Sequence, residues 1–245
     1  FSEQGAQEPI NSFVKALTDK PVVGVGRFTS PDMMVSMIRK GVVDLIGAAR
    51  PSIADPFLPA KVEAGRADEI RECIGCNMCT TGDYIAYPMR CTQNPTVGEE
   101  WRKGWHPEKI PAAKSDEKVL VLGGGPTGLE AALALSNRGY EVTLAEAGAE
   151  LGGRVLRETA LKPLAQWKRV VDHRQFMLSG KANVSLFTQS KMDTNAVLEL
   201  GCAHVAIATG SKGRTDCFGI HHRAPVTTDH PAMVIAPETI IAGMV

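Results

Sequence analysis

Four cysteines carry the chemistry that this sequence suggests most strongly. Cys73, Cys76 and Cys79 follow a Cys-x-x-Cys-x-x-Cys spacing, and Cys91 comes later in the same segment. Structural zinc usually takes two separate Cys-x-x-Cys pairs or adds histidines. A cubane cluster can take three sulfurs from one tight loop and the fourth from a more distant cysteine. The spacing therefore predicts a 4Fe-4S cluster, and a zinc site or simple reduced thiols are the alternatives.

A glycine motif provides a second candidate site. Gly123, Gly125 and Gly128 form Gly-x-Gly-x-x-Gly directly after a strand-like run, and Glu146 ends the next such run. This context predicts a pyrophosphate at a helix N-terminus and a ribose hydrogen-bonded to Glu146. We therefore expect an adenine nucleotide without a 2′-phosphate, and a glycine turn with no ligand is the alternative. Arg154 either contacts phosphate or is a solvated arginine after a turn.

Two strand ends near the start of the chain each combine small residues with an arginine. Gly26-Arg27 ends one strand-like run, and Ala49-Arg50 ends the next. In an eight-stranded parallel barrel, the loops after the last two strands form a phosphate site. The pattern suits the phosphate of FMN, and the alternative is that these arginines pair with nearby carboxylates.

The elements that would position these residues alternate between strands and helices. The expected strands are 21–26, 43–48, 118–122, 141–146, 184–187 and 204–208. The expected helices are 33–39, a stretch from Asp55-Pro56 toward Gly65, 129–138, and a stretch around 164–171. Alternation of this kind implies parallel pairing and an α/β fold. The segment 101–118 has no clear period and reads as a linker.

Composition excludes several classes of function. Lys plus Arg and Asp plus Glu are equal at 27 each, so no basic field favours nucleic acid. No apolar run is long enough to span a membrane, and the first residues do not form a basic and then apolar leader. We expect a cytoplasmic protein that binds neither nucleic acid nor membrane. The first residue is Phe1, which suggests a chain cut from a longer one.

The motifs together resemble those of trimethylamine, dimethylamine and histamine dehydrogenases, a family of iron–sulfur flavoproteins. The resemblance rests on 24–27, 49–56, 73–79, 91–94, 104–108 and the glycine motif at Gly123. It implies the C-terminal part of a TIM (β/α)8 barrel at 1–72, a cluster segment and linker at 73–114, and an incomplete Rossmann-like domain at 115–245. In the related 2,4-dienoyl-CoA reductases the third cysteine lies one residue later, so the spacing here favours the amine dehydrogenases.

The resemblance also implies cofactors, partners and an activity. FMN phosphate would be bound by Gly26, Arg27, Ala49 and Arg50, the cluster by the four cysteines, and ADP, or FAD, by the second domain. FMN would oxidise a small amine, and electrons would leave singly through the cluster to an electron-transferring flavoprotein. The full-length protein would be a homodimer. The catalytic residues would lie outside this chain, because only the last two barrel strands are expected in it.

Two other functions remain open at this point. The first is an NAD(P)H-dependent enoate or 2,4-dienoyl-CoA reductase of the same architecture, which would carry FAD instead of ADP. The second is a non-catalytic module that transfers electrons or binds a nucleotide. Retention of cluster and nucleotide without turnover would fit that module.

Overall fold

The protein is an α/β chain with parallel sheets that divides into two compact units. The computed structural model describes residues 3–82 and 86–212, so part of the expected domain at 115–245 lies outside the described residues. Unit 1 comprises Phe1–Ala113 and Asp172–Gly180, and unit 2 comprises Lys114–Val171 and Lys181–Val245. No helix within the described ranges is long and apolar enough to cross a membrane.

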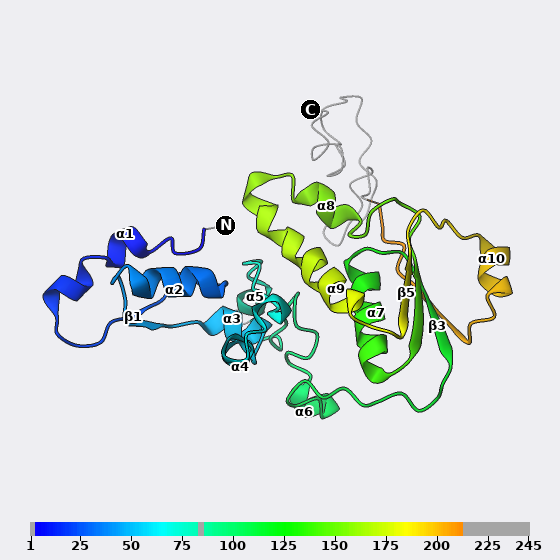
Figure 1. The fold of residues 1–245 in the computed structure, drawn as a ribbon, viewed down its shortest axis with the longest axis horizontal. Helices are drawn as coiled ribbons and strands as arrows, with labels where there is room; N and C mark the ends of the chain where they lie inside the picture. The colour runs from blue at the N-terminus through cyan, green and yellow to red at the C-terminus, as the bar shows by residue number, and fades with distance from the viewer. Residues whose placement is uncertain (1–2, 83–85, 213–245) are drawn as a thin grey trace, which may run out of the picture. The chain divides into compact units, whose positions relative to one another are not determined.

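Unit 1 begins with a small parallel layer covered by one amphipathic helix. Its elements are α1 (Glu8–Asn11), the 3-10 helix η1 (Val14–Leu17), β1 (Val23–Gly24), α2 (Pro31–Arg39) and β2 (Leu45–Ile46). The strands β1 and β2 pair in parallel, as the sequence predicts. Helix α2 lies beside them (Figure 1) and buries Met37 against Phe28 and Val43. The Ser30 hydroxyl caps α2 by accepting from the Met33 amide, which explains why the helix begins at Pro31.

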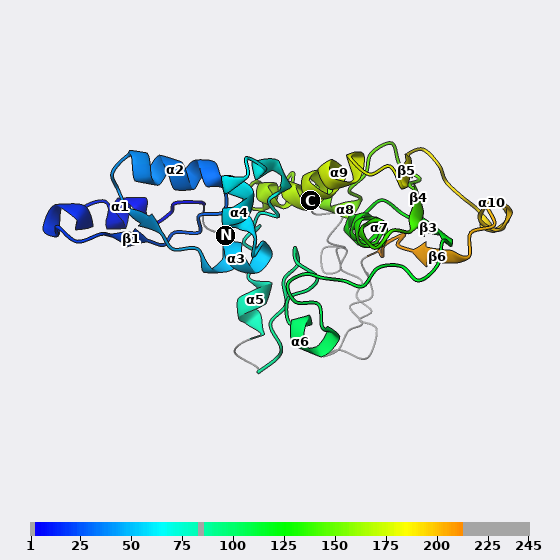
Figure 2. The ribbon, with the colours of Figure 1, turned by 60° about the horizontal axis from the view of Figure 1, so that its bottom comes forward.

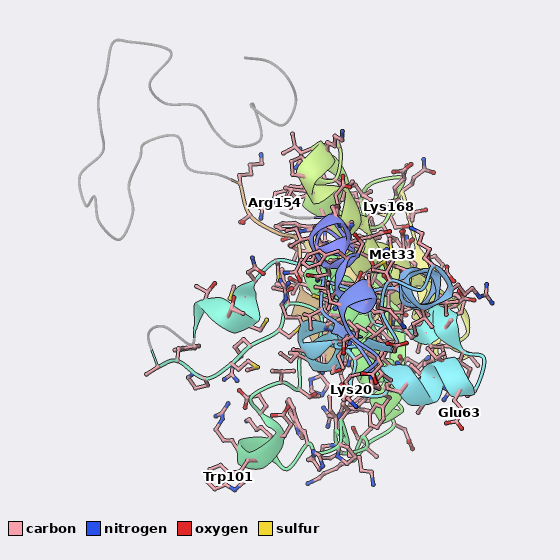
Figure 3. The ribbon with its side chains drawn as sticks, turned by 90° about the vertical axis from the view of Figure 1, so that its left-hand side faces the viewer. Lys20, Met33, Glu63, Trp101, Arg154 and Lys168 are labelled. Atoms are coloured by element: carbon pink, nitrogen blue, oxygen red, sulfur yellow. The ribbon has the colours of Figure 1, made fainter. Side chains whose placement is uncertain are left out.

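The rest of unit 1 consists of short helices joined by irregular backbone. These are α3 (Ala49–Ala54), α4 (Leu58–Glu63), η2 (Ala67–Glu69), α5 (Met78–Thr81) and α6 (Glu100–Lys103). The predicted helix from Asp55-Pro56 was wrong at its start, because Asp55 is extended and α4 begins at Leu58. A residue before proline is disfavoured from the helical region, so Asp55 separates two helices. Trp101 on α6 is 96% exposed and projects away from the ribbon (Figure 3).

Unit 2 is built on four parallel strands in the order β5-β4-β3-β6. Its elements are β3 (Lys118–Leu122), α7 (Pro126–Arg138), β4 (Glu141–Ala145), α8 (Arg154–Glu158), η4 (Lys162–Lys168), β5 (Val184–Phe187), α10 (Thr194–Glu199) and β6 (His204–Ile207). The four predicted strands are confirmed within a residue of their bounds. Helix α7 packs on β3 and β4, and Figure 2 shows α10 on the other side of the sheet. Gly139 ends α7 in the left-handed conformation at φ +101°, as expected of a C-terminal glycine.

Helix α9 (Arg169–Ser179) differs from its prediction. The expected helix around 164–171 is instead the 3-10 helix η4, and the α-helix follows it. The reason is the spacing of buried side chains, because Val171, Arg174 and Leu178 recur on one helical face. One of these is an arginine, so an apolar pattern did not mark the helix. The residues of α9 from Asp172 onward group with unit 1.

Candidate functional site

The cysteine segment of unit 1 forms a pocket that all four predicted ligands line. Residues 71–77 have no helix or strand, and Gly75 at φ +71° and Asn77 at φ +61° bend the chain in the left-handed conformation. The pocket is lined by Arg50, Ile53, Cys73, Ile74, Cys76, Asn77, Cys79, Cys91, Thr92 and Gln93. The fold therefore brings Cys91 to the loop that holds the other three cysteines.

Backbone amides donate to two of the sulfurs, and a hydroxyl group lies beside a third. The amide of Gly75 donates to Cys73 Sγ at 3.4 Å, and the amide of Gln93 donates to Cys91 Sγ at 3.4 Å. Cys76 Sγ lies 3.0 Å from the Thr92 hydroxyl oxygen. Hydrogen bonds of this kind favour a thiolate over a thiol. The backbone amides are therefore placed where they can stabilise thiolates.

Burial opposes that charge when no cation is present. It raises the pKa of the Cys73 thiol, an effect reduced by the Gly75 amide and by the positive charge of Arg50. Burial also raises the pKa of Cys79, and the neighbouring thiols of Cys91, Cys73 and Cys76 raise it further. Deprotonating several of these thiols together requires a positive group among them, as metal coordination provides.

The sulfurs are not grouped as ligands of one ion. Within residues 3–82 and 86–212, no three Cys, His, Asp or Glu side chains lie close enough together to hold a metal ion. A single zinc ion with bonds of ~2.3 Å would hold its sulfurs about 3.8 Å apart. In a cubane each thiolate binds a different iron.

A partly buried ionic network supports the start of the cysteine segment. The Asp55 carboxylate is fully buried and pairs with Lys61 Nζ at 2.5 Å. It also accepts from the backbone amides of Arg71 at 2.9 Å and Phe57 at 3.1 Å. The Arg71 side chain donates to the Ala54 carbonyl at 2.7 Å. The end of α3 is thereby joined to the residues that lead into Cys73.

The same network reaches the far end of the segment through Glu108. Its carboxylate pairs with the Arg71 guanidinium and accepts from Asn94 Nδ2 at 2.8 Å. Asn94 Nδ2 also donates to the Ile53 carbonyl at 3.1 Å, and its Oδ1 accepts from the Thr96 amide at 3.0 Å. One carboxylate therefore holds residues on both sides of the four cysteines. Asp55, Asn94 and Glu108 belong to the motifs that carry the family resemblance, but no local pattern indicates that they meet.

The predicted FMN-binding residues lie near the loop that holds Cys73, Cys76 and Cys79. Gly26 follows β1, Ala49 begins α3, and Arg27 and Arg50 come directly after them. Arg50 Nη1 donates to Asn77 Oδ1 at 2.5 Å. A Cβ on Gly75 would lie 2.7 Å from Arg27 Nε, so this glycine allows the guanidinium to approach the loop.

The nearby carboxylates considered as partners for these arginines bind lysines. Asp44 pairs with Lys15, and Asp55 pairs with Lys61. The Lys15 ammonium and the Val22 amide lower the pKa of Asp44. Both carboxylates therefore pair with a lysine side chain, and Arg50 lines the cysteine pocket.

Helix α9 contributes two side chains that no sequence motif marks as part of a site. Arg174 is only 3% exposed, and it donates through Nη1 to Gln93 Oε1 at 2.9 Å and through Nη2 to the Gln93 carbonyl at 3.2 Å. His173 Nε2 lies 3.2 Å from the Glu69 carbonyl oxygen. Burial is the main cause that lowers the pKa of His173 to about 4, and the positive charge of Arg174 adds to it. This partly buried histidine is therefore neutral at physiological pH.

The glycine motif of unit 2 forms a tight turn between β3 and α7. Gly123 has φ +101°, and a Cβ there would lie 2.4 Å from the Ala208 carbonyl oxygen. A Cβ on Gly128 would lie 1.8 Å from the Gly123 carbonyl oxygen. Both positions therefore require glycine. Gly125 immediately precedes α7, and no side chain caps that helix, so its first amides are available to an anion.

Glu146 holds the glycine turn in place. Its Oε2 accepts from the Gly124 amide at 2.6 Å, and its Oε1 accepts from the Gly148 amide at 2.6 Å. The predicted ribose acceptor thus lies beside the glycine motif, at the carboxyl end of β4. A carboxylate oxygen has more than one lone pair, so these bonds leave room for a further donor.

Two other segments meet the glycine turn. The Gly152 amide donates to the Gly124 carbonyl at 2.7 Å, and the Ala208 amide donates to the Leu122 carbonyl at 2.7 Å. Arg154, labelled in Figure 3, begins α8 and pairs with Glu158 at 2.8 Å. Its side chain is half exposed. The turn, the Gly-Gly-Arg segment and the end of β6 therefore form one site at the carboxyl edge of the sheet.

Two family models match the chain. Residues 1–69 match the NADH:flavin oxidoreductase / NADH oxidase family. Residues 89–230 match the pyridine nucleotide-disulphide oxidoreductase family, which covers the glycine motif and more than half of the chain.

Individual proteins are similar over nearly the whole chain. Dimethylamine dehydrogenase of Hyphomicrobium sp. (strain x) is 43% identical over 94% of this chain and 32% of its own length. The solved structure of histamine dehydrogenase from Rhizobium sp. 4-9 is 55% identical with a TM-score of 0.92, over 100% of this chain and 36% of that one. That of 6-hydroxypseudooxynicotine amine oxidase from Pseudomonas geniculata N1 has the same identity and TM-score, over 99% and 36%. The chain thus spans about a third of the length of these proteins.

Proposed function

Because this chain belongs to the trimethylamine, dimethylamine and histamine dehydrogenase family, we propose that it contributes to an iron–sulfur flavoprotein that oxidises a small methylated amine. The observation that carries the proposal is the cysteine pocket, which all four predicted ligands line together with Arg50. If the cysteines bind an electron carrier and Arg50 binds a flavin phosphate, the two sites would lie together in one unit.

The donor set fits a 4Fe-4S cluster. Cys73, Cys76, Cys79 and Cys91 would bind it, since four thiolates around one pocket provide one ligand for each iron. The amides of Gly75 and Gln93 would stabilise the negative sulfurs of Cys73 and Cys91. When bound, the cluster would supply one-electron transfer between a two-electron flavin and an acceptor.

FMN would lie at the first unit, at the ends of β1 and β2. Gly26 and Ala49 are small residues that would allow a phosphate to approach, and Arg27 and Arg50 would supply positive charge beside it. The strands β1 and β2 would be the last two of a TIM barrel, since the loops after those strands form the usual phosphate site of that fold. The catalytic residues would come from the other strands of the barrel.

The second unit would bind ADP, or FAD, in a Rossmann-like manner. Three features support this: the uncapped start of α7 after Gly125, the close packing at Gly128, and Glu146 beside the turn. The strand order, with the first strand of the unit between the second and the fourth, is also that of dinucleotide-binding sheets. Glu146 would accept from the ribose and repel a 2′-phosphate.

The substrate class proposed for the full-length protein follows from the names of its relatives. The named relatives act on dimethylamine and histamine, which makes a small amine the expected substrate class. An electron-transferring flavoprotein would take the electrons one at a time from the cluster. The full-length protein would be a homodimer.

The proposal can be tested on the full-length protein that contains this chain, purified without oxygen. We expect four irons, four labile sulfides and one FMN per polypeptide, and bleaching of the flavin by methylated amines. NADPH should leave the flavin oxidised. Protein that lacks iron, or that is reduced by NADPH and not by any amine, would contradict the proposal.

One alternative retains specific support. The match to NADH:flavin oxidoreductases over residues 1–69 favours an NAD(P)H-dependent enoate or 2,4-dienoyl-CoA reductase of the same architecture. Such an enzyme would carry FAD in the second unit. Extraction of the bound nucleotide, followed by chromatography, distinguishes FAD from the ADP expected of an amine dehydrogenase.

A further inference from the structure

Arg174 is a buried cation whose partner lies beside a predicted cluster ligand. It comes from α9, far along the chain from the cysteines, yet it belongs to unit 1 and is 3% exposed. Burying a guanidinium is costly unless its donors are satisfied. The groups that accept hydrogen bonds from Arg174 therefore keep its guanidinium stable inside the unit.

Two hydrogen bonds join Arg174 to Gln93. One guanidinium nitrogen donates to the Gln93 side-chain oxygen at 2.9 Å, and another donates to the Gln93 carbonyl at 3.2 Å. Gln93 is 2% exposed, and its Nε2 donates to the Glu72 carbonyl at 3.3 Å. Both the side chain and the backbone of Gln93 are thus held, and Glu72 immediately precedes Cys73.

The held residue reaches a sulfur directly. The Gln93 amide donates to Cys91 Sγ at 3.4 Å. Gln93 also bonds to Glu72, which immediately precedes Cys73. Through Gln93, Arg174 therefore contacts both ends of the segment that holds the four cysteines. Cys91 is also the ligand that stands apart from the Cys-x-x-Cys-x-x-Cys loop, so its position depends on contacts of this kind.

We propose that Arg174 is a positioning residue that holds Gln93 in place. Through the Gln93 amide, Arg174 would strengthen the binding of Cys91 to the cluster and help set the reduction potential of that cluster. The inference rests on the 4Fe-4S site of the proposed function. Outer hydrogen bonds orient metal ligands, and hydrogen bonds to the sulfurs together with nearby charge set cluster potentials. Both the N–H···S bond and a nearby cation favour the reduced, more negative state.

A guanidinium suits this role better than an ammonium. Its rigid fork can bond the side-chain oxygen and the carbonyl of Gln93 at once, whereas a lysine ammonium is a point charge on a flexible stem. Arg174→Lys therefore keeps the charge and loses the two-point hold. Arg174→Gln loses both.

The test uses the full-length protein and three variants: Arg174→Gln, Arg174→Lys and Arg157→Gln. Arg157 is an exposed arginine on α8 and serves as the matched control. The readouts are iron release to a chelator, the cluster's midpoint potential and electron paramagnetic resonance spectrum, and the nucleotide content of the second unit. Nucleotide content reports whether the rest of the protein is folded.

In Arg174→Gln we expect iron release about tenfold faster or more, the range typical for loss of a contact behind a metal ligand. We also expect a lower midpoint potential, by about 59 mV if the reduction equilibrium changes tenfold. Arg174→Lys should release iron quickly with a smaller change in potential. Arg157→Gln should match the wild type, and every variant should keep its nucleotide.

Three results would overturn the inference. Equal iron release, potential and spectrum in Arg174→Gln and wild type would show that Gln93 is held without Arg174. Loss of nucleotide together with iron in both Arg174 variants would indicate a general folding role. A wild-type protein without iron would remove the proposed function as well, whereas the first two results leave it standing.

Discussion

His173 provides a prediction whose size can be worked out from the structure. This side chain is partly buried on α9, its Nε2 meets the Glu69 carbonyl, and its pKa is lowered from 6.5 to about 4. The charged groups around it are the cations Arg174, Arg71 and Lys61, so none of them favours protonation. Between pH 6.5 and about 4 the unfolded chain binds a proton there and the folded chain does not.

Folded stability should therefore fall as the pH drops through this window. A depression of this size corresponds to at most about 3 kcal/mol, and about 2 kcal/mol of it should be lost between pH 7 and pH 4.5. Above pH 6.5 both states are neutral at this site and the effect disappears. The assay is hydrogen exchange of the α9 peptide in the full-length protein, with rates corrected for the intrinsic effect of pH.

The decisive comparison is with His173→Gln, whose amide can still donate to the Glu69 carbonyl but does not titrate. The opening free energy of α9 should lose about 2 kcal/mol less in this variant than in the wild type over the same pH range. His204→Gln is the control, because His204 is 61% exposed and lies in unit 2. An equal pH dependence in wild type and His173→Gln would refute the reasoning.

Three further substitutions test the sites in the two units. Asp55→Ala removes a fully buried carboxylate and leaves the partly buried Lys61 ammonium without its partner, so the free energy of unfolding should fall by about 3–5 kcal/mol, measured by chemical denaturation. Gly128→Ala places a Cβ against the Gly123 carbonyl, so the second unit should lose its nucleotide while iron content stays unchanged. Arg50→Gln removes a charged donor worth about 1.5–3 kcal/mol, so the FMN dissociation constant should rise roughly 10- to 150-fold in titrations of apoprotein.

Each of these changes has a matched control at an open position. Asp19 is exposed, no atom would meet a Cβ on Gly180, and Arg39 is an exposed arginine at the end of α2. Asp19→Ala, Gly180→Ala and Arg39→Gln should leave stability, nucleotide content and FMN affinity unchanged. The assigned contact would be contradicted if a control variant lost as much stability, nucleotide or FMN affinity as the site variant it is matched to. It would also be contradicted if the site variant behaved like the wild type.

Much of the fold followed from local patterns. The strands of unit 2, helix α2 and the parallel pairing of β1 and β2 were predicted because apolar periodicity and glycine positions are local signals. The bounds of α4 and α9 were wrong for local reasons too. An extended residue before Pro56 delays α4, and α9 buries an arginine where an apolar residue would have marked its inner face.

By itself the sequence determined which chemistry is possible, because ligand types and spacing are properties of neighbouring residues. The four cysteines, the glycine motif and Glu146 can all be identified from residue type and spacing alone. Only the tertiary structure joined Arg71, Asn94 and Glu108 around the cysteine segment, and only it brought Arg174 to Gln93. Such pairs lie far apart along the chain and follow no period, so their meeting is decided by how the whole unit packs.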